Sequence, residues 1–208
     1  MFSSFLDSLV TSSNRNLIES IRDGYGLIFE GVHFGDKGVG SDTYLGRMHA
    51  GDGDRGTGHF GTGTYFLSDS NSSSHLRNSR PSHTIDTSGY GLLKVNSAAS
   101  ASDLHKGMKL LNSAVDACIR GDEDVVLGLL DSGIGLISKV VRKANHYGAN
   151  QLLGMAHQKA AIYNSEGISS KHSTLGTDFI RMLGYNGIDV TSVPEYDNSM
   201  YGSVVYDM

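Results

Sequence analysis

The sequence has few of the residues that mark secreted, membrane-spanning and disulfide-rich proteins. Among 208 residues there are one cysteine, Cys118, two prolines and no tryptophan. A lone cysteine excludes an intramolecular disulfide framework and is typical of a reducing compartment. No stretch approaches the roughly 18 consecutive apolar residues of a membrane-spanning helix, and the first residues lack the basic start and apolar core of a signal peptide. These absences predict a soluble, cytoplasmic protein.

Positive charge is also sparse. The chain has 17 basic and 22 acidic residues, a net charge of -5, and no basic block longer than Lys139 to Lys143. This balance indicates neither a nucleic-acid partner nor a membrane surface. The length fits one domain with a sizeable core, so we predict a single domain over residues 1–208.

Glycine is abundant, and it gathers before a short aromatic run. The chain holds 27 glycines, about twice the average share. Six of them lie between His49 and Asp69, directly ahead of a strand expected at residues 64–68. Because glycine allows close backbone approach, this loop predicts a cleft for a phosphate-bearing, ring-containing ligand. Its literal G-x-G-x-x-G match at residues 56–61 is followed by a strand and not a helix, so no Rossmann fold is predicted.

Strand and helix patterns alternate along the chain. Short runs of high β-propensity are expected to form strands at residues 27–34, 64–68, 92–95, 187–190 and 202–206. Helices are expected in two pieces at residues 3–23 and again at 174–183, where Gly184 is a suitable C-cap.

A helical block is expected at about residues 100–164. Apolar residues recur there every three or four positions, starting near Ser102, with glycine stops at Gly121, Gly133 and Gly148. These stops divide the block into four helices. We expect the block to be an insertion between strands that serves as a scaffold.

Other polar clusters do not predict chemistry. His49, Asp52, Asp54 and His59 are close in sequence, but they match neither an EF-hand nor a His-x-x-x-His pair. A solvated polar loop is the favoured interpretation, and no metal site is predicted. His105 is interpreted as a surface residue. Gly-x-Ser-x-Gly is absent, so a hydrolase nucleophile elbow has no support.

The order of several short motifs resembles one enzyme superfamily. A strand ending in His33 comes first, then Gly61-Thr62-Gly63-Thr64-Tyr65-Phe66, a later aliphatic strand, and finally Val204-Val205-Tyr206-Asp207. This order resembles the histidine-tyrosine branch of the ADP-ribosyltransferases, which includes diphtheria-type toxins, poly-ADP-ribose polymerases and many phage-borne domains. The resemblance covers roughly residues 27–95 and 174–208. It implies an α+β fold, a pair of mainly antiparallel sheets around an NAD cleft with an inserted helical subdomain.

The resemblance also implies roles for individual residues. His33 would hydrogen-bond the ribose and carboxamide region of NAD, and Tyr65 would stack on the nicotinamide. The residues implied to bind the NAD are His33, Phe34, Gly35, Gly61, Gly63, Tyr65 and Phe66. In the family the histidine directly precedes a glycine, whereas in this chain Phe34 lies between His33 and Gly35. The alternative alignment matches Phe29-Glu30-Gly31 to the family's aromatic-x-Gly triplet and places an acid where the family has histidine or arginine. The alignment on His33 is preferred.

The catalytic acid departs from the family pattern, because the glutamate position falls on Gly202. The nearest acids are Glu195 and Asp197, which we take as candidate catalytic residues with His33 and Tyr65. Cleavage of the nicotinamide-ribose bond passes through an oxocarbenium-like ion, which a nearby carboxylate stabilises.

Three functions follow from this interpretation. The first is transfer of ADP-ribose from NAD to an unknown macromolecular acceptor, a protein, in the host cytoplasm if the chain is phage-encoded. The second is a catalytically inactive binding or structural module. The third is a metal-dependent hydrolase that uses the Asp52 region.

Overall fold

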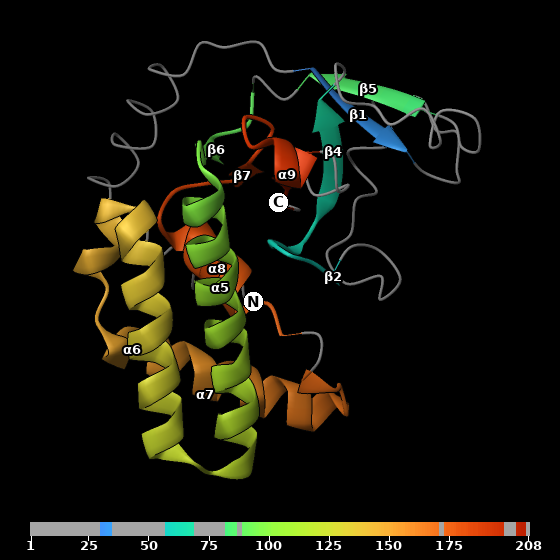
Figure 1. The fold of residues 1–208 in the computed structure, drawn as a ribbon. Coiled ribbons are helices and arrows are strands. Elements are labelled where there is room, and N and C mark those ends of the chain that lie inside the picture. Colours follow the sequence, from blue (N-terminus) through green and yellow to red (C-terminus); the bar gives the residue numbers. More distant parts are fainter. Residues whose placement is uncertain are drawn as a thin grey trace. The chain divides into compact units, whose positions relative to one another are not determined.

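The computed structural model describes residues 30–34, 57–68, 82–86, 89–170, 173–197 and 203–206. The chain divides into two compact units (Figure 1). The helical unit holds α5, α6, η2, α7 and the hairpin β2–β3, and the sheet unit holds β1 and β4 to β8. Helix α8 (Leu175–Met182) begins in the helical unit and ends in the sheet unit.

The helical unit is built on two long helices joined by a tight turn. Helix α5 (Ala98–Arg120) is capped at its start by Ser97, whose hydroxyl accepts from the Ser100 amide at 3.2 Å. It ends at Gly121, whose φ of 79° is the left-handed conformation of a glycine C-cap. Helix α6 (Glu123–Val140) follows at once. The predicted stop at Gly121 is therefore confirmed, while the start lies a turn earlier than expected.

A close approach of α5 and α6 forms the core of this unit. Gly107 and Gly133 face each other, and a Cβ built on Gly133 would lie 3.0 Å from the Gly107 carbonyl oxygen. The predicted helix stop at Gly133 is wrong, because α6 continues through it to Val140. Around this contact the helices bury Leu104, Met108, Leu111, Val126, Leu130 and Ile137.

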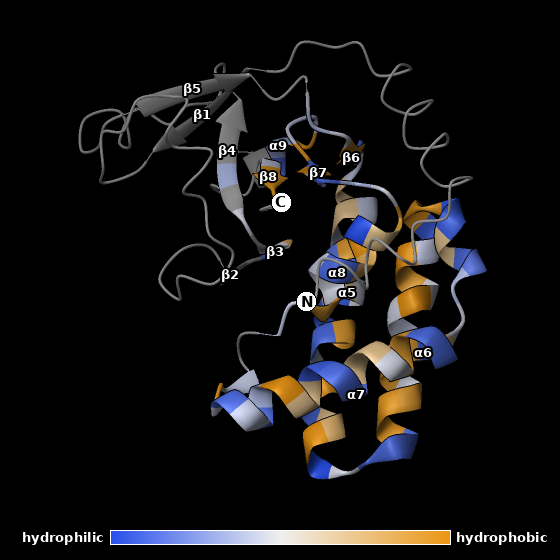
Figure 2. Ribbon diagram, turned by 180° about the vertical axis from the view of Figure 1, so that it is seen from behind, coloured by the Kyte–Doolittle hydropathy of each residue, from blue (hydrophilic) through white to orange (hydrophobic). Residues whose placement is uncertain are grey.

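Two further segments complete the helical unit. They are η2 (Arg142–His146) and α7 (Ala149–Glu166), and α7 ends at Gly167 with a φ of 64°. Figure 2 shows apolar and polar residues alternating along α5, α6 and α7. This alternation is expected of helices that bury one face.

The strands of the sheet unit form one sheet in the order β5-β1-β4-β8-β7-β6. All neighbours pair antiparallel except β6 and β7. Leu93, Ile188 and Val204 occupy one row across β6, β7 and β8, and all three are buried. The strands are β1 (Glu30–Phe34), β4 (Thr64–Ser68), β5 (Ser82–Asp86), β6 (Leu92–Lys94), β7 (Gly187–Asp189) and β8 (Ser203–Val205).

The predicted fold class, a pair of mainly antiparallel sheets around an NAD cleft, is wrong. The described residues are mostly helical. Strand β4 pairs with β1 on one side and β8 on the other, so the early and late strands join in one sheet. Outside this sheet, the described strands β2 (Thr57–Gly58) and β3 (Gly61–Thr62) pair with each other as a hairpin of two residues each. Strands β6, β7 and β8 have three residues each, whereas α5 alone has 23.

Candidate functional site

The strands that carry His33 and Tyr65 are neighbours in the sheet. Val32 of β1 pairs with Leu67 of β4. Continuing this register by one residue sets His33 opposite Phe66, and by two residues sets Phe34 opposite Tyr65. The sheet therefore brings the two predicted ligand-binding strands together. His33 and Tyr65 occupy adjacent rows, and adjacent rows alternate between the two faces of a sheet. Gly35 lies outside the described residues.

Tyr65 lies half-buried in β4, where it pairs with Val204 of β8. Its neighbour Tyr206 is completely buried, and burial raises the pKa of the Tyr206 phenol well above its usual range. The Tyr65 phenol raises that pKa further, since two phenolates so close would repel each other. Tyr65 is therefore one member of a tyrosine pair, and it keeps part of its surface open.

Backbone packing explains two of the glycines before Tyr65. Gly61 has a φ of 95°, and a Cβ there would collide with the Thr177 hydroxyl of α8. A Cβ on Gly63 would lie 2.5 Å from the Val205 carbonyl oxygen. Both positions require glycine whether or not a ligand binds. Residues 51–56 of the same loop fall in a part of the chain that the structure does not describe.

Both predicted acids are in a short helix, α9 (Pro194–Asp197). Glu195 is exposed there, and Asp197 is the last helical residue. Gly202, the position of the family's glutamate, lies beyond the described residues. The described strand β8 has the sequence Ser-Val-Val and contributes no carboxylate.

A buried acid that the sequence analysis missed lies one strand further along. Asp189 of β7 is 3% exposed. Its Oδ1 accepts from the Ser203 hydroxyl at 3.0 Å, the Thr191 hydroxyl at 2.7 Å and the Thr191 amide at 3.0 Å. The spacing Asp-x-Thr after an apolar strand is typical of an Asx turn and was the available signal. Asp189 thus ties the end of β7 to β8.

The strand register places Asp189 in a polar row across the sheet. Asp189 pairs with Ser203, and Ser203 pairs with Phe66. The row ends at Lys94, the partner of Asp189 on β6. On the other side, the continued β1–β4 register adds His33, which pairs with His83 of β5. A carboxylate, a hydroxyl and a histidine position thus share one row.

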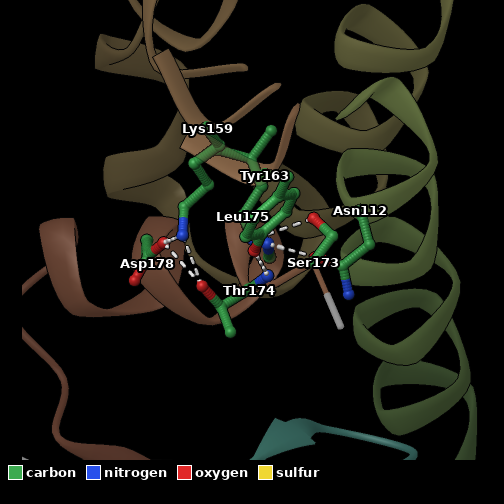
Figure 3. A network of polar contacts seen from close by, with 8 residues as sticks. Asn112, Lys159, Tyr163, Ser173, Thr174, Leu175 and Asp178 are labelled. Atoms are coloured by element: carbon green, nitrogen blue, oxygen red, sulfur yellow. Dashed lines mark hydrogen bonds and ion pairs between the residues drawn. The ribbon is translucent and has the colours of Figure 1, made fainter. Parts of the chain in front are cut away.

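The helical unit contains a separate buried network (Figure 3). The Lys159 ammonium lies 2.6 Å from Asp178 Oδ2, and their side chains are only 11% and 13% exposed. Lys159 also donates to the Thr174 hydroxyl, which donates to Asp178 Oδ2 at 3.2 Å. The ammonium lies 5.9 Å from the centre of the Tyr163 ring. Burial makes the loss of one partner costly, because the other charge is then buried without a counter-ion.

The same network supplies partners for the first amides of α8. The Thr174 amide donates to the Tyr163 hydroxyl at 3.2 Å, and the Gly176 amide donates to Asn112 Oδ1 at 2.8 Å. Helix starts leave such amides without intrahelical partners. Because Lys159 donates to Thr174 and pairs with Asp178, the network stabilises the start of α8. Sequence reasoning did not single out any of these residues.

No protein family model, curated protein or solved structure matches this chain. Within the described ranges, every helix is too short or too polar to cross a membrane. In the same ranges, no three histidine, cysteine, aspartate or glutamate side chains are grouped to hold a metal ion.

Proposed function

We propose that the protein binds NAD on strands β1 and β4 and transfers its ADP-ribose to a protein acceptor. The supporting observation is the pairing of these two strands, whose continued register sets Phe34 in the same row as Tyr65. Neighbouring strands are about 4.8 Å apart, so one nicotinamide riboside is large enough to contact both positions of that row. The half-buried Tyr65 ring offers the stacking surface.

The reaction breaks the bond between the ribose C1′ and the nicotinamide nitrogen. Nicotinamide leaves as a neutral molecule, an acceptor nucleophile forms the new bond to C1′, and its proton passes to a carboxylate. Glu195 and Asp197 are the candidate proton acceptors from the sequence. Asp189 is two strands from β4, about 10 Å away, and already accepts three hydrogen bonds.

A second candidate function is NAD binding without transfer. The specific observation is that β8, the strand next to Tyr65, has only Ser203, Val204 and Val205 and no acid. A site without a nearby carboxylate binds the dinucleotide but leaves the developing positive charge without stabilisation.

Replacing Tyr65 by alanine is expected to weaken NAD binding by about 1–3 kcal/mol, the range for base-on-ring stacking. Titration calorimetry with NAD measures the loss. Tyr65→Phe is the matched control, because it keeps the ring and should bind within about twofold of wild type. Equal affinity of Tyr65→Ala and wild type would remove Tyr65 from the site.

Transfer is tested by incubating the protein with labelled NAD and a cell lysate, and measuring labelled protein and free nicotinamide. Replacement of the acting carboxylate by its amide should lower the rate by about 100-fold or more. Glu195→Gln, Asp197→Asn and Asp189→Asn are compared in parallel. If wild type binds NAD but releases no nicotinamide, the transfer proposal fails and binding alone stands.

A further inference from the structure

Helix α6 has a second apolar face beside the one that it buries, and we call it the outer face. Its residues recur every three or four positions, so they lie along one side of the helix. They are Val125, Gly128, Leu129, Ser132, Gly135 and Leu136. Val125 is 45% exposed, and the two leucines are half-buried. The outer face therefore leaves apolar surface in contact with solvent over about three helical turns.

The outer face carries a repeat that suits contact with another helix. The pair Gly-Leu occurs at residues 128–129 and again at 135–136, seven residues further along. Seven residues are close to two helical turns, so the two glycines lie in one line along the helix and the two leucines in another. A Cβ built on either glycine meets nothing within 4 Å, so the backbone is open to close approach there. A second helix can therefore lie beside the glycines and against the leucines.

The charges at the two ends of α6 select the direction of the second helix. The first turn is acidic, with Glu123 and Asp124, and the last turn carries Lys139. All three residues are exposed, and Lys139 lies 3.5 Å from Asp103 of α5 in a pair that solvent reaches. An antiparallel helix with the same charges places acid beside base at both ends, whereas a parallel one places like charges together. The helix that meets this requirement is α6 of a second copy.

We propose that two copies of the protein associate through the outer faces of α6, antiparallel and centred on Ser132. This register sets Leu129 of each copy beside Leu136 of the other, and Asp124 beside Lys139. Two-fold symmetry makes each of these contacts occur twice. A membrane surface is the poorer partner, because its anionic headgroups would repel the acidic first turn of α6 and a chain of net charge -5. The interface lies within the helical unit and does not require the NAD site on β1 and β4.

The dimer is expected to be weak, because one helix face buries much less than the roughly 800 Å² per partner of a stable interface. Association should therefore depend on protein concentration. Sedimentation velocity of the full chain should show mainly monomer at about 10 µM and mainly dimer at about 500 µM, as a Kd of about 100 µM predicts. Monomer at both concentrations overturns the proposal.

Charge reversal tests the antiparallel register. Asp124→Lys alone and Lys139→Glu alone each place like charges together at both ends of the pairing, so each should weaken the dimer about fivefold. An equimolar mixture of the two variants should recover wild-type association, because every Lys then lies beside an acid of the other copy. A loss that comes from damage to the monomer would not recover on mixing. Failure of the mixture to recover contradicts the register.

Two further variants locate the interface. Ser132→Arg brings two arginines together at the two-fold axis and should weaken the dimer about tenfold or more. Lys106→Glu, on an exposed residue of α5, has the same charge change as Lys139→Glu and should leave the dimer unchanged. A dimer that persists in Ser132→Arg lies on another surface and overturns the proposal. So does a monomer that binds phosphatidylcholine vesicles and loses that binding in Val125→Asp, since the outer face would then dock on lipid.

Discussion

Replacing Lys159 by methionine is expected to lower the free energy of unfolding by about 3–5 kcal/mol. The substitution keeps the length of the side chain but leaves Asp178 without its counter-ion in a site where it is 13% exposed. The Thr174 hydroxyl loses its lysine donor as well. Among the described residues, the carboxylate then keeps the Thr174 hydroxyl as its donor in place of the ammonium 2.6 Å away. Denaturation by urea at pH 7, followed by circular dichroism, measures the loss.

The control is Lys139→Met on α6. Lys139 also faces an acid, Asp103 at 3.5 Å, but its side chain is 64% exposed. A solvated pair of this kind contributes about 1 kcal/mol or less. The double variant Lys159→Met/Asp178→Leu should recover part of the loss, because it leaves no uncompensated charge. Equal effects of the two lysine variants would show that the Lys159 pair is not buried.

Local signals in the sequence predicted two helix ends, at Gly121 and Gly184, although the stop expected at Gly133 was wrong. Gly121 ends α5 with a φ of 79°, and Gly184, just after α8, has a φ of 93°. These predictions succeed because a glycine C-cap depends on the backbone of a few consecutive residues. The strands β4, β6 and β7 also fall where β-propensity indicated.

Long-range partners account for what the sequence did not predict. Lys159 looks like any other lysine in a helical pattern, and its partner Thr174 is 15 residues further along the chain. Asp189, at the end of a strand, likewise accepts a hydrogen bond from a hydroxyl 14 residues away, that of Ser203. The fold class failed for the same reason. Strand propensity located β4 and β8 but did not reveal that they pair in one sheet.

Replacing Gly133 by alanine is expected to lower the free energy of unfolding by about 1–3 kcal/mol, the range for overpacking a core. Alanine is the better helix former, so propensity alone predicts the opposite sign. The new methyl group would lie 2.8 Å from Leu111 Cδ2 and 3.0 Å from the Gly107 carbonyl oxygen of α5. Since the obstacle includes backbone, it cannot move aside unless the two helices separate.

The same helix provides the controls, because Gly128 and Gly135 are exposed and a Cβ on either meets nothing within 4 Å. Alanine at these positions should raise stability by about 0.5–1 kcal/mol through helix propensity alone. Thermal and urea unfolding of the three variants should therefore separate Gly133→Ala from its controls by about 1.5–4 kcal/mol. A stabilising Gly133→Ala would mean that α5 and α6 do not approach at Gly107. In that case close packing against α5 would not be the reason why Gly133 lies inside a helix and does not end it.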